Sequence, residues 1–182
     1  MFFRYLAVFF TSLLFLAPTS YSQFRQAISE AHGSAAAFSP GDVLVGGYCS
    51  LDNAPSGASD VFVAKVNRSG ALDTSFANNG ILKFSASEKT RIRLRHLSVN
   101  ADDKIVIAGE KFIYPESFTE PGKNLTYINR YNSDGSFDTN FSNGGKYERR
   151  DDSVLVRTMS SDSSNALYTA GIKGVPVNGE FI

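Results

Sequence analysis

The side chains best suited to bind an ion lie in a short phrase near residue 135. Asn132, Asp134 and Asp138 supply oxygen atoms at even-numbered positions, and oxygen is the ligand that Ca²⁺ prefers. A helix-loop-helix calcium loop has glycine at its sixth position and a bidentate glutamate at its twelfth. Here Gly135 comes fourth, no such glutamate follows, and the earlier copy of the phrase has Ser69 in place of Asp134. We therefore predict no metal site and no bound cofactor.

The remaining candidates for catalysis are few and scattered. His32 and His96 are the only histidines and Cys49 is the only cysteine, whereas a zinc site needs three or four ligands at defined spacings. The adjacent Asp102 and Asp103 are typical of a hairpin turn. No nucleophile elbow, phosphate loop or Ser/His/Asp pattern occurs. The sequence thus predicts no catalytic residue. Beside an apolar stretch, Cys49 is expected to be a small buried residue.

Three arginines at alternate positions indicate a charged strand face. Arg91, Arg93 and Arg95 share one side of an extended chain. They form either a contact row for anionic glycans or phosphates, or a solvated face opposite Ile92, Leu94 and, if the alternation continues, His96. The row contains no interleaved aromatic residue, and the chain has 18 Lys plus Arg against 18 Asp plus Glu. This balance argues against a nucleic-acid partner. We favour the solvated face.

The phrase itself is the strongest organising signal. It runs from Gly70 to Gly80 and again from Gly135 to Gly145, and the two copies align without a gap. We expect the aspartates to cap tight turns, the phenylalanines to fill the space between neighbouring units, and the glycines to adopt unusual backbone angles. The residues of this signature are Asp73, Phe76, Gly80, Asp138, Phe141 and Gly145, together with Gly47, Gly109 and Gly171, which close β-branched or apolar runs at equal intervals along the chain.

Around these signature residues the sequence predicts short antiparallel strands. Each run that ends in Gly47, Gly109 or Gly171 is expected to form a hairpin with the strand before it. A third strand is expected over 61–67 and 125–131, and a fourth over 81–84 and 146–148. The units span approximately 33–84, 92–149 and an incomplete 154–182. No convincing helix is present. The prediction is an all-β chain of antiparallel four-stranded repeats, partial and β-propeller-like, with a β-sandwich as the alternative.

The repeat resembles the delta-sixty repeat family. The matching residues are 131–141 with Gly144-Gly145, joined to 103–109, and the resemblance covers most of 41–172. The first copy departs from the usual Asp-Gly turn with the segment 67–70. The resemblance implies an exported bacterial protein with propeller-like blades, and it carries no family-wide catalytic residue.

The N-terminus predicts export. Arg4 precedes an apolar run over 6–17, and Ser20-Tyr21-Ser22 offers small residues before a cut ahead of Gln23. The alternative is an uncleaved anchor. We expect residues 1–22 to be a signal peptide and 23–182 to be one β-repeat domain. After cleavage no stable membrane span is expected. Because two units and a hairpin are fewer than a closed propeller needs, the chain is interpreted as a fragment or truncated product with unpaired end strands that favour self-association.

Taken together, these features favour an exported, non-enzymatic scaffold. It would be secreted, periplasmic or held at the bacterial cell surface, and it would bind an unidentified surface protein or glycan. The alternative is a truncated propeller enzyme, a lyase or glycoside hydrolase acting on extracellular polysaccharide. Its site would lie in the long loop from Glu110 to Lys123, which contains Tyr114, Glu116 and Glu120.

Overall fold

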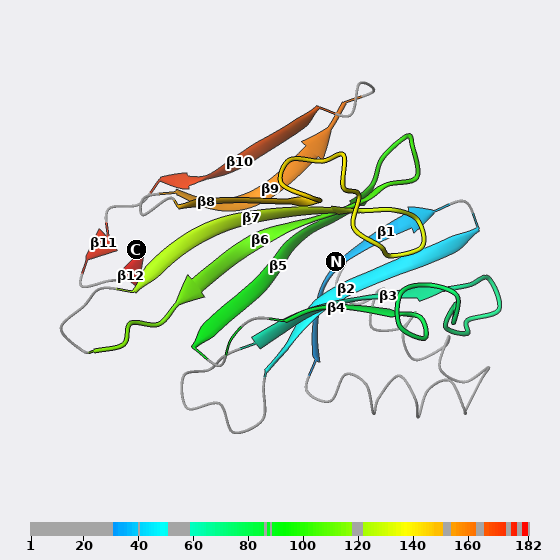
Figure 1. The fold of residues 1–182 in the computed structure, drawn as a ribbon, viewed down its shortest axis with the longest axis horizontal. Coiled ribbons are helices and arrows are strands. Elements are labelled where there is room, and N and C mark those ends of the chain that lie inside the picture. Colours follow the sequence, from blue (N-terminus) through cyan, green and yellow to red (C-terminus); the bar gives the residue numbers. More distant parts are fainter. Residues whose placement is uncertain are drawn as a thin grey trace, which may run out of the picture.

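The structure is a computed structural model that describes residues 31–39, 41–50, 59–85, 87, 89–117, 122–150, 154–162, 166–173, 176–177 and 180–181. The expected signal peptide, residues 1–22, lies outside the described residues. Every regular element within the described part is a β-strand (Figure 1). The prediction of an all-β fold is confirmed.

The first unit is a four-stranded antiparallel sheet. Its strands pair in sequence order, with β2 between β1 and β3, and β4 on the other side of β3. Val, Ile, Leu and Phe dominate β3 and β4, in keeping with the preference of such residues for pleated, buried surfaces. The strands are β1 (Ala31–Ser39), β2 (Asp42–Ser50), β3 (Ser59–Val66) and β4 (Ile81–Phe84).

The second unit repeats this order, and a hairpin follows it. The four strands of the second unit are again antiparallel neighbours in sequence order, and the following hairpin has the same antiparallel form. The second unit comprises β5 (Thr90–Val99), β6 (Ile105–Ile113), β7 (Lys123–Tyr131) and β8 (Lys146–Arg150); the later strands are β9 (Val154–Ser161), β10 (Leu167–Lys173), β11 (Pro176–Val177) and β12 (Glu180–Phe181). The four-stranded antiparallel repeat is thus present twice.

A buried serine joins the two units. Ser59 at the start of β3 forms the single parallel bridge recorded between the described units, to Arg91 of β5. Its hydroxyl donates to the carbonyl of Ile92 at 2.6 Å and accepts from the amide of Ile92 at 3.1 Å. Both hydrogen bonds are buried, so their loss would leave unsatisfied backbone groups at the seam between the units.

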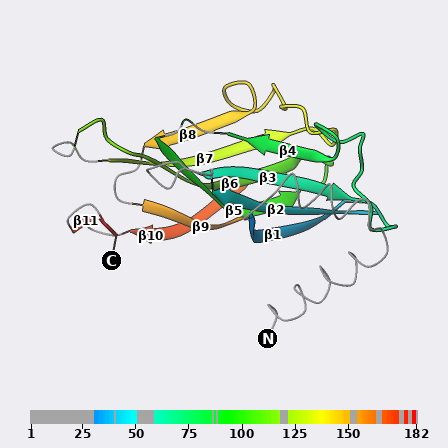
Figure 2. The same cartoon turned by 90° about the horizontal axis from the view of Figure 1, so that it is seen from below.

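Apolar residues form layers between successive units. The strands of units one and two belong to one eight-stranded sheet, joined through β3 and β5. The largest core lies between these two units; it contains Ala37, Leu44, Val61, Val63, Phe76, Leu82, Ile92, Leu94, Leu97, Ile105, Ile107, Tyr127 and Tyr131. A second layer joins unit two to the β9–β10 hairpin and contains Val106, Ala108, Ile128 and Met159, with Phe141 and Leu167 at its border. Figure 1 shows the strands of successive units side by side, with β1–β4, β5–β8 and β9–β10 in order across the picture, and Figure 2 shows the same strands from below. The stacked units give the chain its β-propeller-like form.

Each hairpin carries a β-bulge at the same place. In the second unit the pairing shifts between Leu94 and His96, which leaves Arg95 as the extra residue; the shifts in the first and third hairpins fall opposite Gly46-Gly47 and Ala170-Gly171. A bulge interrupts the alternation of side chains along a strand. Leu97 therefore joins Leu94 in the core, and His96 is transferred to the arginine side of β5. The expectation that His96 lies opposite the arginines is wrong for this reason.

Candidate functional site

The repeated phrase forms a tight turn whose polar groups bond to one another. The Asp73 carboxylate accepts from the amide and hydroxyl of Ser75 at 3.1 and 2.5 Å. The Asp138 carboxylate accepts from the amide of Asn140 at 3.2 Å. The closing glycine of each turn, Gly80 in the first copy, has a positive φ of 90°. The carboxylate of each phrase thus caps a backbone N–H group of its own turn.

The preceding turn, where calcium ligation was considered, is organised in the same way. Asp134 Oδ1 accepts from the amide and hydroxyl of Ser136 at 2.8 and 2.7 Å, and Asn132 donates to the Ser136 hydroxyl at 2.8 Å. Among the residues that the structure describes, no group of three or more His, Cys, Asp or Glu side chains is placed to hold a metal ion. Asp134 is drawn into a side-chain turn, and the Ser136 hydrogen bonds lower the pKa of its carboxyl group.

In the first unit, a lysine lies between two carboxylates. Lys65 Nζ is 3.3 Å from Asp42 and 3.1 Å from Asp73. Burial acts to lower the pKa of Lys65, but the hydrogen bonds that its ammonium donates to Asp73 and Asp42, together with their negative charge, outweigh burial, so the pKa is raised. The pKa of Asp73 is lowered, mainly by the hydrogen bonds from Ser75 and Lys65. The ionised forms of this cluster are therefore mutually stabilised.

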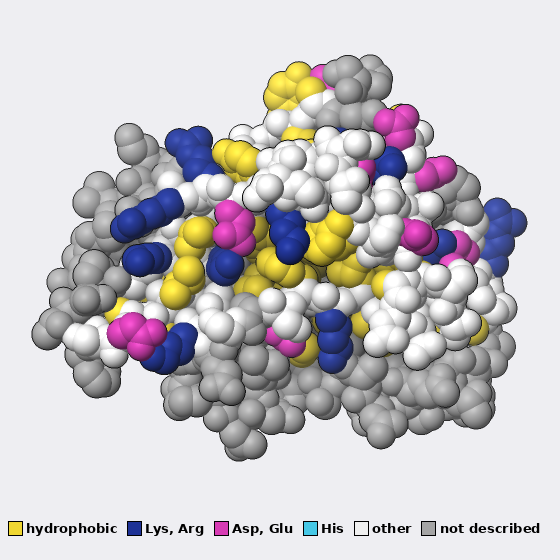
Figure 3. Space-filling view, in the orientation of Figure 1, with side chains coloured by type: hydrophobic (Ala, Val, Ile, Leu, Met, Phe, Trp, Pro, Cys, Tyr) yellow, Lys and Arg dark blue, Asp and Glu magenta, His cyan; other side chains and the backbone are white. Residues whose placement is uncertain are grey.

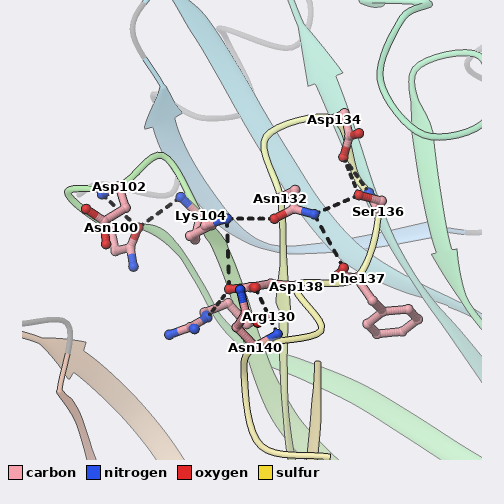
Figure 4. A network of polar contacts seen from close by, with 10 residues as sticks. All are labelled: Asn100, Asp102, Lys104, Arg130, Asn132, Asp134, Ser136, Phe137, Asp138 and Asn140. Atoms are coloured by element: carbon pink, nitrogen blue, oxygen red, sulfur yellow. Dashed lines mark hydrogen bonds and ion pairs between the residues drawn. The ribbon is translucent and has the colours of Figure 1, made fainter. Parts of the chain in front are cut away.

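In the second unit, an aspartate lies between two cations (Figure 4). Arg130 Nε donates to Asp138 Oδ2 at 2.7 Å, and Lys104 Nζ lies 4.0 Å from the same oxygen. Lys104 also donates to Asn132 Oδ1 at 2.7 Å. Burial acts to raise the pKa of Asp138, but the Asn140 amide and the Arg130 guanidinium outweigh it, so the pKa is lowered. The carboxylate stays ionised inside the turn.

The first phrase also connects the two units. Phe76 is buried in the core between them, and its neighbour Ala77 donates a backbone hydrogen bond to the carbonyl of Asp134 at 2.7 Å. Gly135 has a φ of +89°, and a Cβ there would lie 2.7 Å from the Cβ of Ala77 and 3.0 Å from the Phe76 ring. The glycine of the second unit thus leaves room for the phenylalanine turn of the first.

Phe141, the counterpart of Phe76, lies in a different environment. It is half-buried at the border of the layer shared with β9 and β10, and the guanidinium of Arg130 lies 4.7 Å from the centre of its ring. This geometry is within the range of a cation–π contact. The same residue type therefore fills a closed interface in one copy and borders a partly open one in the other.

The arginine row of β5 is half-buried rather than solvated. Arg91 and Arg93 lie over the rings of Phe112 and Tyr48 at 5.5 and 5.9 Å, while Arg95 pairs with a carboxylate, Glu110, at 2.9 Å. The prediction of a solvated face is wrong, because aromatic rings from neighbouring strands cover Arg91 and Arg93. The pattern of β5 alone does not show these rings. With these contacts the row is not a free anion-binding surface.

His96 is half-buried on the same side of β5. Its Nε2 is buried and has no hydrogen-bond partner in the described structure, and burial lowers the pKa of the imidazole. The side chain of His32 is outside the described residues.

The long loop is shorter than its sequence suggested. Glu110–Ile113 continue β6 and Lys123 opens β7, so the connection begins at Tyr114. Glu116 is exposed and pairs with Lys89, and Glu120 lies outside the described residues. The predicted pairing of Glu116 with Glu120 therefore lies outside the described residues.

Cys49 and Tyr127 are two further side chains with titratable groups, and both are buried. Cys49 is 7% exposed, and burial together with the nearby Asp60 raises the pKa of its thiol, which disfavours the reactive thiolate. The hydroxyl of Tyr127 donates to the carbonyl of Arg93 at 3.2 Å. A Cβ on Gly109 would lie 1.9 Å from that carbonyl, so this glycine permits the close approach of the bulge.

Sequence reasoning missed the exchange of charge between the two units. Lys65 and Arg130 occupy equivalent positions and share a positive charge. Asp42 and Lys104 also occupy equivalent positions, but their charges have opposite signs. Asp42 begins β2 and Lys104 directly precedes β6. Aligning these two residues, in addition to the repeated phrase, would have shown the change in the sign of the charge.

Comparison with known families agrees with the fold. A family model described as a domain of unknown function (DUF5122), beta-propeller, matches residues 41–76 and 117–141. No curated protein gives a significant match. Within the described residues, no helix is long and apolar enough to cross a membrane. The chain is thus similar over part of its length to a β-propeller repeat family.

Proposed function

We propose that the chain is an exported, non-enzymatic delta-sixty repeat protein that acts as a binding scaffold in the periplasm, at the cell surface or outside a bacterial cell. The observation that carries this proposal is the use of the repeated polar groups. The carboxylates of both phrases bond to their own turns and to Lys65 or Arg130. They hold the strands and turns of each unit together, which leaves the outer surfaces for recognition.

The surface supports recognition of a protein or neutral glycan over a polyanion. On the face seen in Figure 3, acidic and basic side chains are interspersed with apolar ones, and the net charge of the chain is zero. Nucleic-acid binding depends on clustered positive charge. We expect no salt-sensitive binding to DNA or RNA.

The binding role is tested with the purified chain immobilised and exposed to a glycan array and to extracellular proteins of a bacterial culture. Saturable retention of one glycan class or one protein supports a scaffold. Turnover of a polysaccharide panel, measured as release of reducing ends, would contradict it. The matched control for turnover carries Glu116→Gln and Glu120→Gln, which remove the two carboxylates of the connecting segment.

Export is tested separately. Expression of the chain with its own N-terminus in a bacterial host, followed by fractionation and N-terminal sequencing, should give a product that begins at Gln23 outside the cytoplasm. A full-length product retained in the membrane fraction would favour the uncleaved anchor instead.

A further inference from the structure

Strand β10 differs from its two counterparts in the number of neighbours. The equivalent strands β2 and β6 are each hydrogen-bonded on both sides, to β1 and β3 and to β5 and β7. In the described structure β10 is paired with β9 alone. Among the described residues its second edge has no partner strand, and an unpaired edge is the usual template for an added strand.

Burial gives an independent measure of the same difference. Ala108 is 0% exposed and Gly109 is buried in β6, whereas their equivalents Ala170 and Gly171 are exposed, and Tyr168 is 60% exposed. The residues from Tyr168 to Gly171 are thus uncovered in the positions where both other units have a third strand.

The free edge of β10 also lacks the charged side chains that protect β8, the outer strand of unit two. β8 consists of Lys146–Arg150, whose side chains are all exposed and mostly charged, and charge on an edge strand discourages pairing. The exposed stretch of β10, Tyr168–Gly171, has no charged residue and no proline. The second edge of β10 is therefore open to pairing.

The two complete units define what such a strand must carry. In unit one, Phe62 lies opposite Gly47, Val63 opposite Gly46 and Lys65 opposite Leu44. In unit two, the corresponding pairs are Tyr127 with Gly109, Ile128 with Ala108 and Arg130 with Val106. The third strands of both units thus share a four-residue pattern over 62–65 and 127–130: an aromatic residue, a β-branched aliphatic residue, a variable residue and a cation. The aromatic residue lies opposite the signature glycine of β2 or β6, the β-branched residue lies opposite the residue before that glycine, and the cation lies opposite the residue three positions before it.

We propose that β10 binds an antiparallel strand of this sequence type, from a polypeptide segment outside residues 1–182, with its aromatic residue opposite Gly171. This inference rests on the proposed role of the chain as a binding scaffold, and it names the class of partner. The β-branched residue lies opposite Ala170 and the cation opposite Tyr168.

The exposed side chains around this edge match the proposed strand. Tyr168 offers its ring to the cation, and its hydroxyl is hydrogen-bonded to Asp162 at 2.9 Å, which places a carboxylate beside the same position. In unit two, Tyr127 packs in one core with Leu82 of β4. The counterpart of Leu82 is Tyr147, which is 39% exposed. An aromatic residue opposite Gly171 would cover it.

A second copy of this chain is disfavoured as the source of the strand. The matching segments, in β3 and β7, are already paired on both sides. We therefore expect the purified chain to remain monomeric in light scattering across a wide concentration range. Concentration-dependent dimers that protect β10 from hydrogen exchange would overturn the assignment of the partner.

The test uses the full chain and a labelled nine-residue peptide with the sequence of 59–67, Ser-Asp-Val-Phe-Val-Ala-Lys-Val-Asn. Fluorescence anisotropy should show saturable binding, and hydrogen exchange should show new protection over Leu167–Gly171. Protection over Lys146–Arg150 instead, or equal binding of a scrambled peptide, would overturn the proposal. If the peptide fails to bind while the array or culture assay finds a partner, this inference fails and the proposed function stands.

Substitutions on each side sharpen the test. In the peptide, replacing the lysine by glutamate should weaken binding about two- to fivefold through loss of the cation–π contact, and replacing the phenylalanine by serine should weaken it further. In the chain, Tyr168→Ser should give a loss similar to that of the lysine replacement. The control is Lys83→Ser, an exposed change on the edge strand β4, and it should leave peptide affinity unchanged. Equal losses for Tyr168→Ser and Lys83→Ser would contradict the assignment.

Discussion

The two copies of the repeated turn neutralise charge with opposite arrangements. In the first copy a cation, Lys65, lies between two carboxylates. In the second copy an anion, Asp138, lies between two cations. Only the residue at the entry to the second strand changes sign, from Asp42 to Lys104. What the repeat preserves is a paired cluster at this corner rather than a particular residue at each position.

The two copies also differ in how completely they are covered. Phe76 is 1% exposed in the core between units, and its turn bonds to the Asp134 carbonyl of the next unit. Phe141 is half-buried and borders a smaller apolar layer. One turn sequence therefore supports both a closed joint and a partly open one, because the neighbouring unit decides the burial.

The largest expected effect separates the two phenylalanines. Phe76→Ala removes a fully buried ring and should lower the free energy of unfolding by about 3–5 kcal/mol, measured by urea denaturation. Phe141→Ala should cost less, about 1–2 kcal/mol, because part of its ring is already solvated. Equal losses would show that the two joints are energetically equivalent.

The glycine under the first phrase offers the next test. Gly135→Ala forces a non-glycine residue to a φ of +89° and places its Cβ 2.7 Å from Ala77, so we expect a loss of about 2–4 kcal/mol from strain and overpacking. Gly144→Ala is the matched control, because Gly144 also has a positive φ but nothing lies within 4 Å of the added Cβ. The control should lose only about 1–2 kcal/mol in the same denaturation assay.

Removing the carboxylate from each charge cluster should lower stability by a smaller amount, and the loss should differ between the two clusters. Asp138→Asn leaves the partly buried Lys104 and Arg130 without their shared carboxylate and should lower the melting temperature by several degrees. Asp73→Asn should lower it less, because Lys65 retains Asp42. Adding Lys104→Asp to Asp138→Asn should restore part of the loss, since Arg130 regains a carboxylate. A double variant less stable than Asp138→Asn alone would contradict the equivalence of the two arrangements.

The pH dependence of stability should reflect the first cluster at both extremes. The pKa of Lys65 is raised above its usual 10.5, so its contribution is complete below pH 10.5 and is lost as the pH rises through the raised value. Tyr131, whose pKa is raised to about 12 mainly by burial, adds to the same alkaline loss. The pKa of Asp73 is lowered below 3.8, so its contribution is lost as the pH falls through the lowered value. The urea midpoint measured against pH should fall less steeply at alkaline pH in Lys65→Met and at acid pH in Asp73→Asn.

The smallest effect concerns His96. Its pKa lies below the usual 6.5 because of burial, so its neutral form favours the folded state above pH 6.5, and this contribution is lost as the pH falls through the lowered pKa. His96→Thr, which copies Thr158 of the third hairpin, should flatten the change in thermal stability between pH 7 and pH 5 by a small amount. An unchanged slope would show that the imidazole is hydrated before it titrates.

Much of the fold was predictable because repeat spacing is a property of the chain itself. Turn residues at fixed offsets and alternating apolar positions specify short antiparallel strands, and two aligned copies of the phrase placed the third and fourth strands. The exact faces were less predictable. Arg95 occupies a bulge, and an extra residue shifts every later side chain by one position, so His96 and Leu97 changed sides.

The sequence by itself determined the repeated unit, its all-β class and the spacing of Asp73, Phe76 and Gly80 with their second copies. Tertiary structure alone decided which of these residues were covered and what they paired with. Phe76 is buried because Gly135 of another unit makes room for it, and the Lys104–Asp138 contact joins residues from different segments of unit two. Such contacts depend on how strands and units stack, and local propensity carries no information about a neighbour that is distant in the sequence.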